Sequence, residues 1–219
     1  RLHVHLQPVG EGLQVEVFMQ PFTDAGPIYK PGAGGITVFA EVDGKQLQAA
    51  RDFSVETAHL EQLHQQCPGL YQSKEEKWIL DDAEMALDAL LQLQELGDFV
   101  VLEWPKGQKI KVSHEVGLGQ AHFSVRKEKD WFSVEGEVQI DELQVYDMQR
   151  LINLLNASSG RFLKLDDGQF VALTSELRQR LDDVSGLGEQ KGNKLQFHAL
   201  AAPALNEALE GMQVNASKQ

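Results

Sequence analysis

Hydrophobic and polar residues alternate along many short stretches of this chain, a pattern typical of half-buried β-strands. Residues 2–6 and 13–17 alternate in this way around the turn "PVGEG", which predicts an antiparallel hairpin. The stretch "ITVFAEVDGKQLQAA" predicts a second hairpin, because Asp43-Gly44 tolerates the positive φ angles of a tight turn. "RFLKLDDGQFVAL" predicts a third hairpin, which turns at residues 166–168.

Apolar residues at helical spacing predict about five helices between these strands. The first follows Ser54 as its N-cap and stops at Pro68. Asp81 and Glu84 resemble a capping box for the second helix, which ends near Gly97. The remaining three helices are expected to start at Asp147, Thr174 and Pro203.

Further strands are expected in the middle of the chain. "DFVVLEW" is apolar on both faces and predicts a central strand, with "QKIKVS" as its partner. "QAHFSVRK" and "WFSVEGEVQI" predict two more strands, the second with strict alternation. The predicted class is therefore α+β, with mostly antiparallel sheets. Two subdomains are expected, a hairpin-rich one over 1–98 and a sheet with three helices over 99–219.

The chain has 219 residues, 42% of them hydrophobic and 24% charged, which is the composition of an ordinary globular protein. Its net charge of −13 opposes non-specific attraction to nucleic acid or anionic lipid. The single cysteine, Cys67, excludes an internal disulfide and indicates a reducing compartment. No apolar stretch approaches the roughly 20 residues that span a bilayer, and no signal peptide is evident. With a single cysteine and no signal peptide, we expect a cytoplasmic protein. The chain starts at Arg1 without a methionine, so we also expect it to be an excised piece of a longer protein.

Asp166-Asp167-Gly168 raises the question of a metal or phosphate site. A calcium loop of the EF-hand type alternates its acidic ligands and ends in a glutamate, and no such pattern surrounds these two adjacent aspartates. Aspartate in a turn accepts hydrogen bonds from nearby backbone amides, and glycine adopts left-handed angles. We therefore predict an exposed hairpin corner.

His3 and His5 should share one strand face, with Glu16 on the neighbouring strand, and such a set could bind iron or zinc. An ordinary surface strand explains the same pattern, and the prediction is no metal. His59 and His64 are five residues apart and do not share a helix face. "PGAGG" precedes a strand, whereas phosphate-binding loops open a helix. No nucleotide-binding or hydrolase motif occurs, so we expect no cofactor and no catalytic residue in this chain.

One segment departs from the acidic trend. Residues 104–129 carry six basic residues against two acidic ones, a local surplus of four positive charges. Trp104, Phe123 and Trp131 lie in or beside this segment. Basic residues with interleaved aromatics can contact phosphates and bases, whereas the favoured interpretation is a solvated strand pair with its aromatics in the core. The residues proposed for nucleic-acid contact are Lys106, Lys109, Lys111, Arg126, Lys127 and Lys129.

The second half of the chain resembles a known family. "DWFSVEGEVQID", "LINLLNASSGRFLKLDDGQFVALTSELRQRLDDV" and "KLQFHALAAPALNEAL" are similar to the helicase-associated region of bacterial Swi/Snf-type ATPases, over residues 130–210. The resemblance implies two motor lobes beyond Gln219, which would bind ATP and Mg²⁺ and translocate on DNA. It also implies that the partners are those motor lobes and, through the parent protein, DNA or RNA-polymerase-type complexes. It transfers no catalytic residue to this chain.

The expected function is therefore a non-catalytic accessory region of an ATP-dependent DNA translocase, with weak or no DNA binding of its own and no membrane contact. A free-standing protein- or nucleic-acid-binding adaptor is the alternative. A metal-dependent enzyme built on His3, His5 and Glu16 is a third hypothesis.

Overall fold

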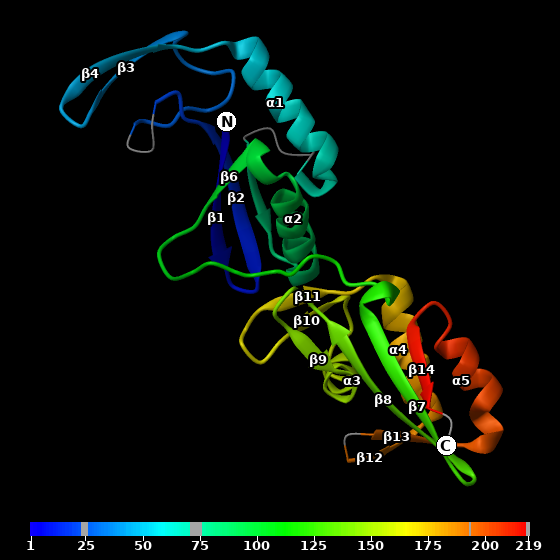
Figure 1. Cartoon of the computed structure of the whole chain (residues 1–219). Helices are drawn as coiled ribbons and strands as arrows, with labels where there is room; N and C mark the ends of the chain where they lie inside the picture. Colours follow the sequence, from blue (N-terminus) through cyan, green and yellow to red (C-terminus); the bar gives the residue numbers. More distant parts are fainter. Residues whose placement is uncertain (23–25, 71–75, 193, 218–219) are drawn as a thin grey trace. The chain divides into compact units, whose positions relative to one another are not determined.

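The computed structural model describes residues 1–22, 26–70, 76–192 and 194–217, which form five α-helices and fourteen strands. The chain divides into two compact units, Arg1–Ile110 and Lys111–Gln219, coloured from blue to green and from green to red (Figure 1). Most strand pairs are antiparallel. The predicted α+β class is confirmed.

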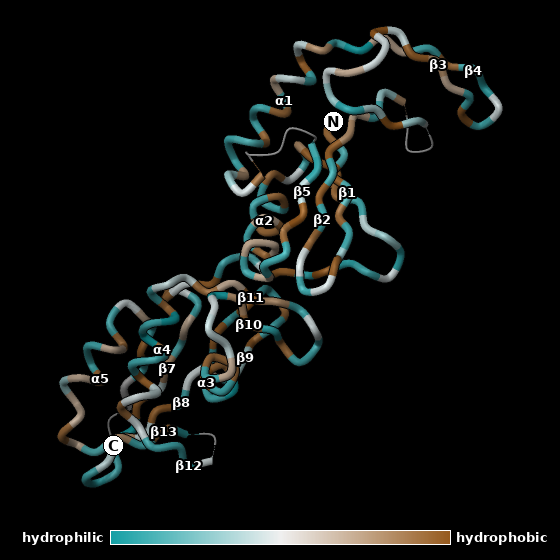
Figure 2. Tube along the Cα trace, turned by 180° about the vertical axis from the view of Figure 1, so that it is seen from behind, coloured by the Kyte–Doolittle hydropathy of each residue, from teal (hydrophilic) through white to brown (hydrophobic). Residues whose placement is uncertain are grey.

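Unit 1 contains a four-stranded sheet in the order β5-β2-β1-β6. The hairpin of β1 (Leu2–Val9) and β2 (Gly12–Met19) is the one that the alternating pattern predicted. Leu2, Val4 and Leu6 are buried, and hydrophobic and hydrophilic positions alternate along both strands (Figure 2). Helix α2 (Ala83–Glu95) packs its buried leucines against β2, β5 (Lys77–Leu80) and β6 (Val100–Glu103).

β6 corrects the expectation for "DFVVLEW", because it lies at the edge of this sheet and pairs parallel to β1. Residues 108–113 form no strand beside it, and within that stretch Val112 makes an isolated bridge to Phe170 in unit 2. Parallel pairing requires a long crossover, here through β2 to α2, which local periodicity does not reveal. The same pairing places β6 in unit 1, so the division falls at Ile110 rather than at residue 98.

β3 (Thr37–Val42) and β4 (Lys45–Ala50) form a two-stranded sheet of their own, turning at Asp43 and Gly44 with φ angles of 52° and 72°. Helix α1 (Phe53–Gln66) follows directly. Its N-cap is Asp52, whose Oδ1 accepts hydrogen bonds from the backbone amides of Ser54 and Val55, so the prediction of Ser54 was two residues late. For α2 the cap is Asp82 rather than Asp81, and it accepts from Met85 N.

Unit 2 contains a sheet in the order β12-β13-β8-β7-β14, with β9 also paired to β8. β7 (Ala121–Glu128) and β8 (Trp131–Gln139) are the two alternating strands expected from the sequence. β13 (Lys194–His198) pairs with the first half of β8, and β9 (Val145–Asp147) with its end. β12 (Glu189–Lys191) and β14 (Gln213–Ser217) form the two edges.

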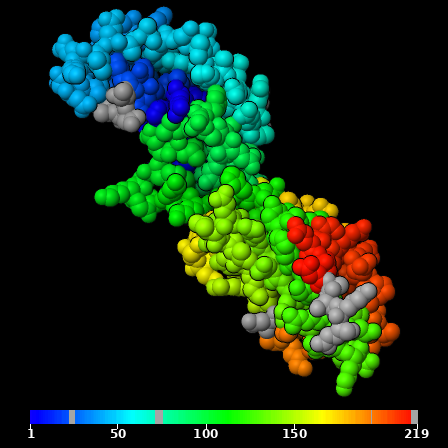
Figure 3. Space-filling view, viewed as in Figure 1, coloured from blue at the N-terminus to red at the C-terminus, as the bar shows by residue number. Residues whose placement is uncertain are grey.

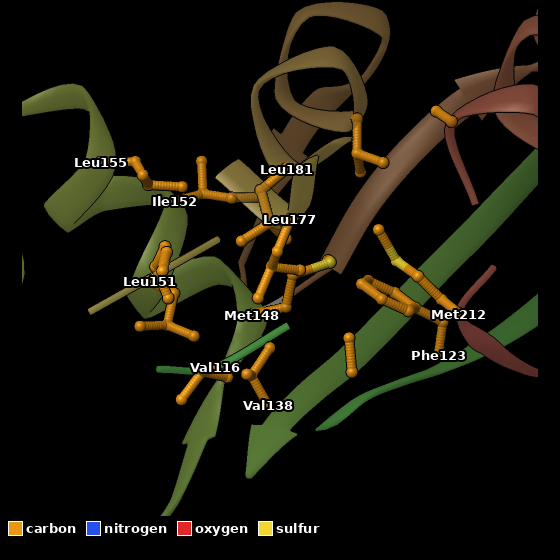
Figure 4. Close-up of a cluster of buried hydrophobic side chains, with 14 of the residues drawn as sticks. Val116, Phe123, Val138, Met148, Leu151, Ile152, Leu155, Leu177, Leu181 and Met212 are labelled. Atoms are coloured by element: carbon orange, nitrogen blue, oxygen red, sulfur yellow. The ribbon is translucent and has the colours of Figure 1, made fainter. Parts of the chain in front are cut away.

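Three helices pack on one face of this sheet, namely α3 (Met148–Asn156), α4 (Ser175–Leu187) and α5 (Ala202–Ala208). Their apolar side chains join Phe123, Val134 and Val138 in one hydrophobic core (Figure 4). Asp147 and Thr174 cap α3 and α4, as predicted, and Pro203 lies in the first turn of α5. The hairpin of β10 (Phe162–Lys164) and β11 (Phe170–Ala172) adds Leu163 and Val171 to the same core.

Candidate functional site

The six basic residues proposed for nucleic-acid contact are divided between the two units. Lys106 and Lys109 are exposed residues of the segment that follows β6 in unit 1. Lys111, Arg126, Lys127 and Lys129 belong to unit 2.

Within unit 2 these cations lie at opposite ends of the β7–β8 ladder. The carbonyl of Lys111 accepts a hydrogen bond from Phe170 N, 2.8 Å away, beside the corner of the β10–β11 hairpin. That corner is joined to the C-terminal end of β8 through Gln144. Arg126 and Lys127 lie near the C-terminal end of β7, and Lys129 lies in the turn that precedes β8. At about 3.3 Å per residue, the nine-residue β8 separates these ends by roughly 25 Å, so unit 2 presents no single basic patch of these four residues.

The three aromatic residues of the basic segment have different environments. Phe123 is 1% exposed in the core, as the favoured interpretation expected. Trp131 is 39% exposed and meets His198 edge-to-face, with ring centroids 5.3 Å apart, so for Trp131 that interpretation was wrong. Trp104 lies beside His5 and Glu103 at a small depression in unit 1. Around Trp131, Glu128 and Asp130 alternate with Lys127 and Lys129, which leaves little excess positive charge for a phosphate.

His3 and His5 do share one strand face, and their carboxylate partner is Glu103 rather than Glu16. His3 Nδ1 lies 2.5 Å from Glu103 Oε1, and His5 Nε2 lies 2.9 Å from Glu103 Oε2. Glu16 instead pairs with Lys77, whose Nζ is 2.5 Å from Glu16 Oε1. Glu103 comes from β6, and its parallel pairing with β1 could not be read from the sequence.

His3 Nδ1 and Glu103 Oε1 are hydrogen-bonded to each other, which links β6 to β1. His5 Nε2 is within ion-pair distance of Glu103 but makes no hydrogen bond to any described residue. Over the described ranges, no group of three histidine, cysteine, aspartate or glutamate side chains is arranged to hold a metal ion.

Asp166-Asp167-Gly168 is a hairpin corner. Gly168 has a φ of 83°, and Asp167 Oδ1 accepts a hydrogen bond from Gln169 N at 3.0 Å. Asp167 Oδ2 accepts from Gln144 Nε2 at 2.8 Å, and Asp166 pairs with Arg150 of α3. The amide of Gln169, followed by Gln144, stabilises the carboxylate and holds the pKa of Asp167 below its ordinary value. Both carboxylates therefore link the corner to neighbouring segments.

A polar groove of about 670 Å³ crosses the face of the unit 2 sheet that the helices leave bare. Two of its three carboxylates are already engaged. Glu135 lies 2.7 Å from Lys194 Nζ, which lowers its pKa, and Asp147 accepts from the amides of Gln149 and Arg150 to cap α3. The groove residues that carry polar side chains are His122, Ser124, Glu135, Glu137, Asp147 and Asn215. The arrangement is a polar surface.

Cys67 is fully buried, and this burial, with the nearby charge of Glu95, raises its pKa to about 12. A thiol with this pKa stays protonated at neutral pH and is a poor nucleophile. This environment is consistent with a structural role for Cys67.

A buried ion pair in unit 1 had no recognisable signal in the sequence. Arg51 Nε and Nη2 donate to the two carboxylate oxygens of Glu56 at 2.9 and 2.6 Å. Arg51 also donates to the carbonyls of Lys30 and Ala33, and its guanidinium lies 4.9 Å from the ring centroids of both Tyr29 and Phe53. Glu56 accepts from Gly32 N at 2.9 Å. These contacts join the 29–33 loop, the end of β4 and the first turn of α1.

Comparison with known proteins gave no match: no family model, no curated protein and no solved structure is significantly similar to this chain. No helix in the described part of the chain is long and apolar enough to cross a membrane.

Proposed function

We propose that this chain is a non-catalytic accessory region of a Swi/Snf-type ATP-dependent DNA translocase. In this proposal the motor lobes belong to the same cytoplasmic polypeptide and lie beyond Gln219, and ATP and Mg²⁺ bind there. The chain supplies a surface that packs against, guides or regulates those lobes. DNA, or a polymerase-type complex, is reached through the parent protein.

One observation carries the proposal: the three segments that resemble the helicase-associated region build a single core. "WFSVEGEVQI" supplies Val134 and Val138, the "GRFLKLDDGQF" hairpin supplies Leu163, and the "ALAAPAL" helix supplies Leu205. Motifs that are weak singly are thus parts of one packed unit, as expected of a region shared within a family.

Several polar side chains of unit 2 already have hydrogen-bond or ion-pair partners within the fold, which supports a non-catalytic role. Asp147 and Thr174 cap helices, Asp166 and Asp167 hold a hairpin corner, and Glu135 is paired with Lys194. Each of these contacts stabilises the fold, and none places an activated nucleophile beside a base. These residues therefore support a chain that acts through its surface.

A free-standing adaptor is the second candidate, and the exposed apolar residues of the β3–β4 sheet favour it. The two candidates differ in the polypeptide encoded downstream of Gln219. Reading the coding sequence beyond the Gln219 codon should reveal a G-x-x-x-x-G-K-[ST] loop that opens a helix and, further on, an acidic Mg²⁺-binding box. A stop codon, or a domain without these motifs, would overturn the proposal in favour of the adaptor.

A further inference from the structure

The two-stranded sheet of β3 and β4, together with the residue that precedes β3, exposes three large hydrophobic side chains. Ile36, Phe39 and Leu47 are 63%, 69% and 38% exposed. The light-blue residues of this part of unit 1 lie at the surface in the view of Figure 3. Phe39 pairs with Gln48 and Leu47 with Ala40, so Phe39 and Leu47 lie on opposite faces of the ladder. A lone two-stranded sheet is marginally stable in water, and both faces of this one expose an apolar side chain.

The buried pair of Arg51 and Glu56 fixes the base of this sheet. Arg51 directly follows β4, and its backbone N donates to Ile36 O at 2.7 Å, which extends the ladder by one pair. Its side chain is held by the carbonyls of Lys30 and Ala33. The sheet is therefore presented in a defined orientation rather than as a loose loop.

The hydrogen-bond pattern identifies which backbone groups of β4 point toward a partner. Hydrogen-bonded and non-hydrogen-bonded pairs alternate along an antiparallel ladder. Arg51 and Ile36 form a hydrogen-bonded pair. The alternation therefore makes Ala49–Val38 and Leu47–Ala40 hydrogen-bonded pairs as well. The intervening residues point their N–H and C=O groups outward from β3, and they are Gln46, Gln48 and Ala50.

This outer edge carries few of the features that protect edge strands. Natural edges are blunted by proline, bulges, inward charges or lysines. Residues 45–50, "KQLQAA", contain no proline, and their pairing with β3 runs without a bulge. The only charge is Lys45, at the tip. Such an edge is suited to strand addition.

We propose that the occupant is the β4 strand of a second copy of this chain, added antiparallel about a two-fold axis through Gln48. This register uses all three outward residues, since Gln46 faces Ala50 of the second copy and Gln48 faces Gln48. Leu47 then lies opposite Ala49, apolar against apolar. The product is a four-stranded sheet, β3-β4-β4-β3, which exceeds the size at which sheets become stable.

The charges along the edge are compatible with self-pairing. In this register Lys45 lies opposite Arg51 of the second copy, whose side chain is 1% exposed and neutralised by Glu56. No like charges meet at the exposed edge. The net charge of −13 on each copy still opposes the encounter, so added salt strengthens the dimer by screening.

Substitution of Gln48 with charged residues tests the axis directly, because residue 48 meets its own copy. Gln48→Glu and Gln48→Lys each place two like charges about 5.5 Å apart, which should weaken self-association about tenfold. An equimolar mixture of the two variants pairs opposite charges and should recover association as a heterodimer. Gln48 is exposed, so both variants should keep the wild-type circular dichroism and melting temperature.

Sedimentation equilibrium from about 5 to 500 μM at about 0.15 and 0.5 M NaCl is the measurement, a range that spans weak self-association. The same two substitutions at Gln190, an exposed residue of β12 in unit 2, are the matched control and should leave association unchanged. A wild-type chain that stays monomeric throughout would overturn the proposal. So would variants at residue 48 that dimerise like the wild type, or a mixture that shows no recovery. None of these outcomes depends on whether motor lobes lie beyond Gln219.

Discussion

Arg51 and Glu56 form an ion pair that is almost fully excluded from solvent, with side chains 1% and 5% exposed and Arg51 Nη2 2.6 Å from Glu56 Oε2. Burying two charges costs free energy that only their mutual contact and additional hydrogen bonds offset. The carbonyls of Lys30 and Ala33 and the amide of Gly32 provide those bonds. The pair therefore holds three segments of unit 1 in register.

Removing one partner should be far more costly than removing an exposed pair. Arg51→Met leaves Glu56 buried without a counter-charge and should lower the free energy of unfolding by about 3–5 kcal/mol. Arg150→Met, which breaks the exposed pair with Asp166, is the control and should cost about 0.5 kcal/mol or less. Urea denaturation of both variants measures the difference, and equal losses would contradict the importance of the buried pair.

Gly168 and Gly186 should respond in opposite directions to the same substitution. A Cβ at either position meets nothing within 4 Å, so space does not distinguish them. Gly168 has a φ of 83°, where an L-residue costs roughly 1–2 kcal/mol, whereas Gly186 lies in α4, where alanine gains roughly 0.5 kcal/mol. Thermal unfolding of Gly168→Ala and Gly186→Ala tests this. A neutral Gly168→Ala would mean that the corner does not need left-handed backbone.

The hairpins, the five helices and most caps could be predicted because their causes are local. Asp43-Gly44 favours a tight turn whatever surrounds it. Leu177, Leu181 and Val184 share a helix face because of their spacing alone. The misplaced caps, Ser54 for Asp52 and Asp81 for Asp82, reflect neighbouring residues with equal capping chemistry. Which of them accepts the amide hydrogen bonds depends on the approach of the preceding chain.

The contacts that could not be predicted from the sequence join segments that are far apart along the chain. Glu103 reaches His3 only because β6 pairs with β1, about one hundred residues earlier in the chain. Arg51 looked like an ordinary charged residue, and its burial depends on a loop some 20 residues away. Likewise, six cations that are close in sequence lie in two units and, in unit 2, at two ends of one sheet.

Asp167 should make stability depend on pH at the acidic end. Its folded-state pKa lies below the ordinary value of 3.8, so its stabilising effect is present above that value and is lost as pH falls through the folded pKa. Asp167→Asn should be mildly less stable at neutral pH, and the difference from the wild type should vanish at strongly acidic pH. Carbon-detected NMR titration of the Asp167 carboxyl checks the sign. A pKa at or above 3.8 would contradict the stabilising role of Asp167. A melting temperature raised several degrees by calcium or magnesium in the wild type alone would instead identify a metal site.

The isolated chain should bind DNA no better than roughly 10⁻⁴ M at physiological salt, the weak end of non-specific binding. Within unit 2 the cations lie at two ends of one sheet, which allows few simultaneous phosphate contacts, and a net charge of −13 repels the polyanion. Fluorescence anisotropy with labelled duplex and single strand over a salt series measures this affinity. Micromolar binding at physiological salt that weakens in Lys109→Glu/Lys111→Glu would show instead a DNA-binding module.

The central claim is that this chain carries no motor chemistry of its own, and phosphate release from ATP by the purified chain tests it most directly. Nucleotide hydrolysis needs a phosphate-binding loop at a helix start, and no such loop occurs in the sequence. The expected result is release no faster than buffer alone, with or without duplex or single-stranded DNA and Mg²⁺. Release that co-purifies with the chain through two orthogonal chromatographic steps, and that rises when DNA is added, would contradict this claim.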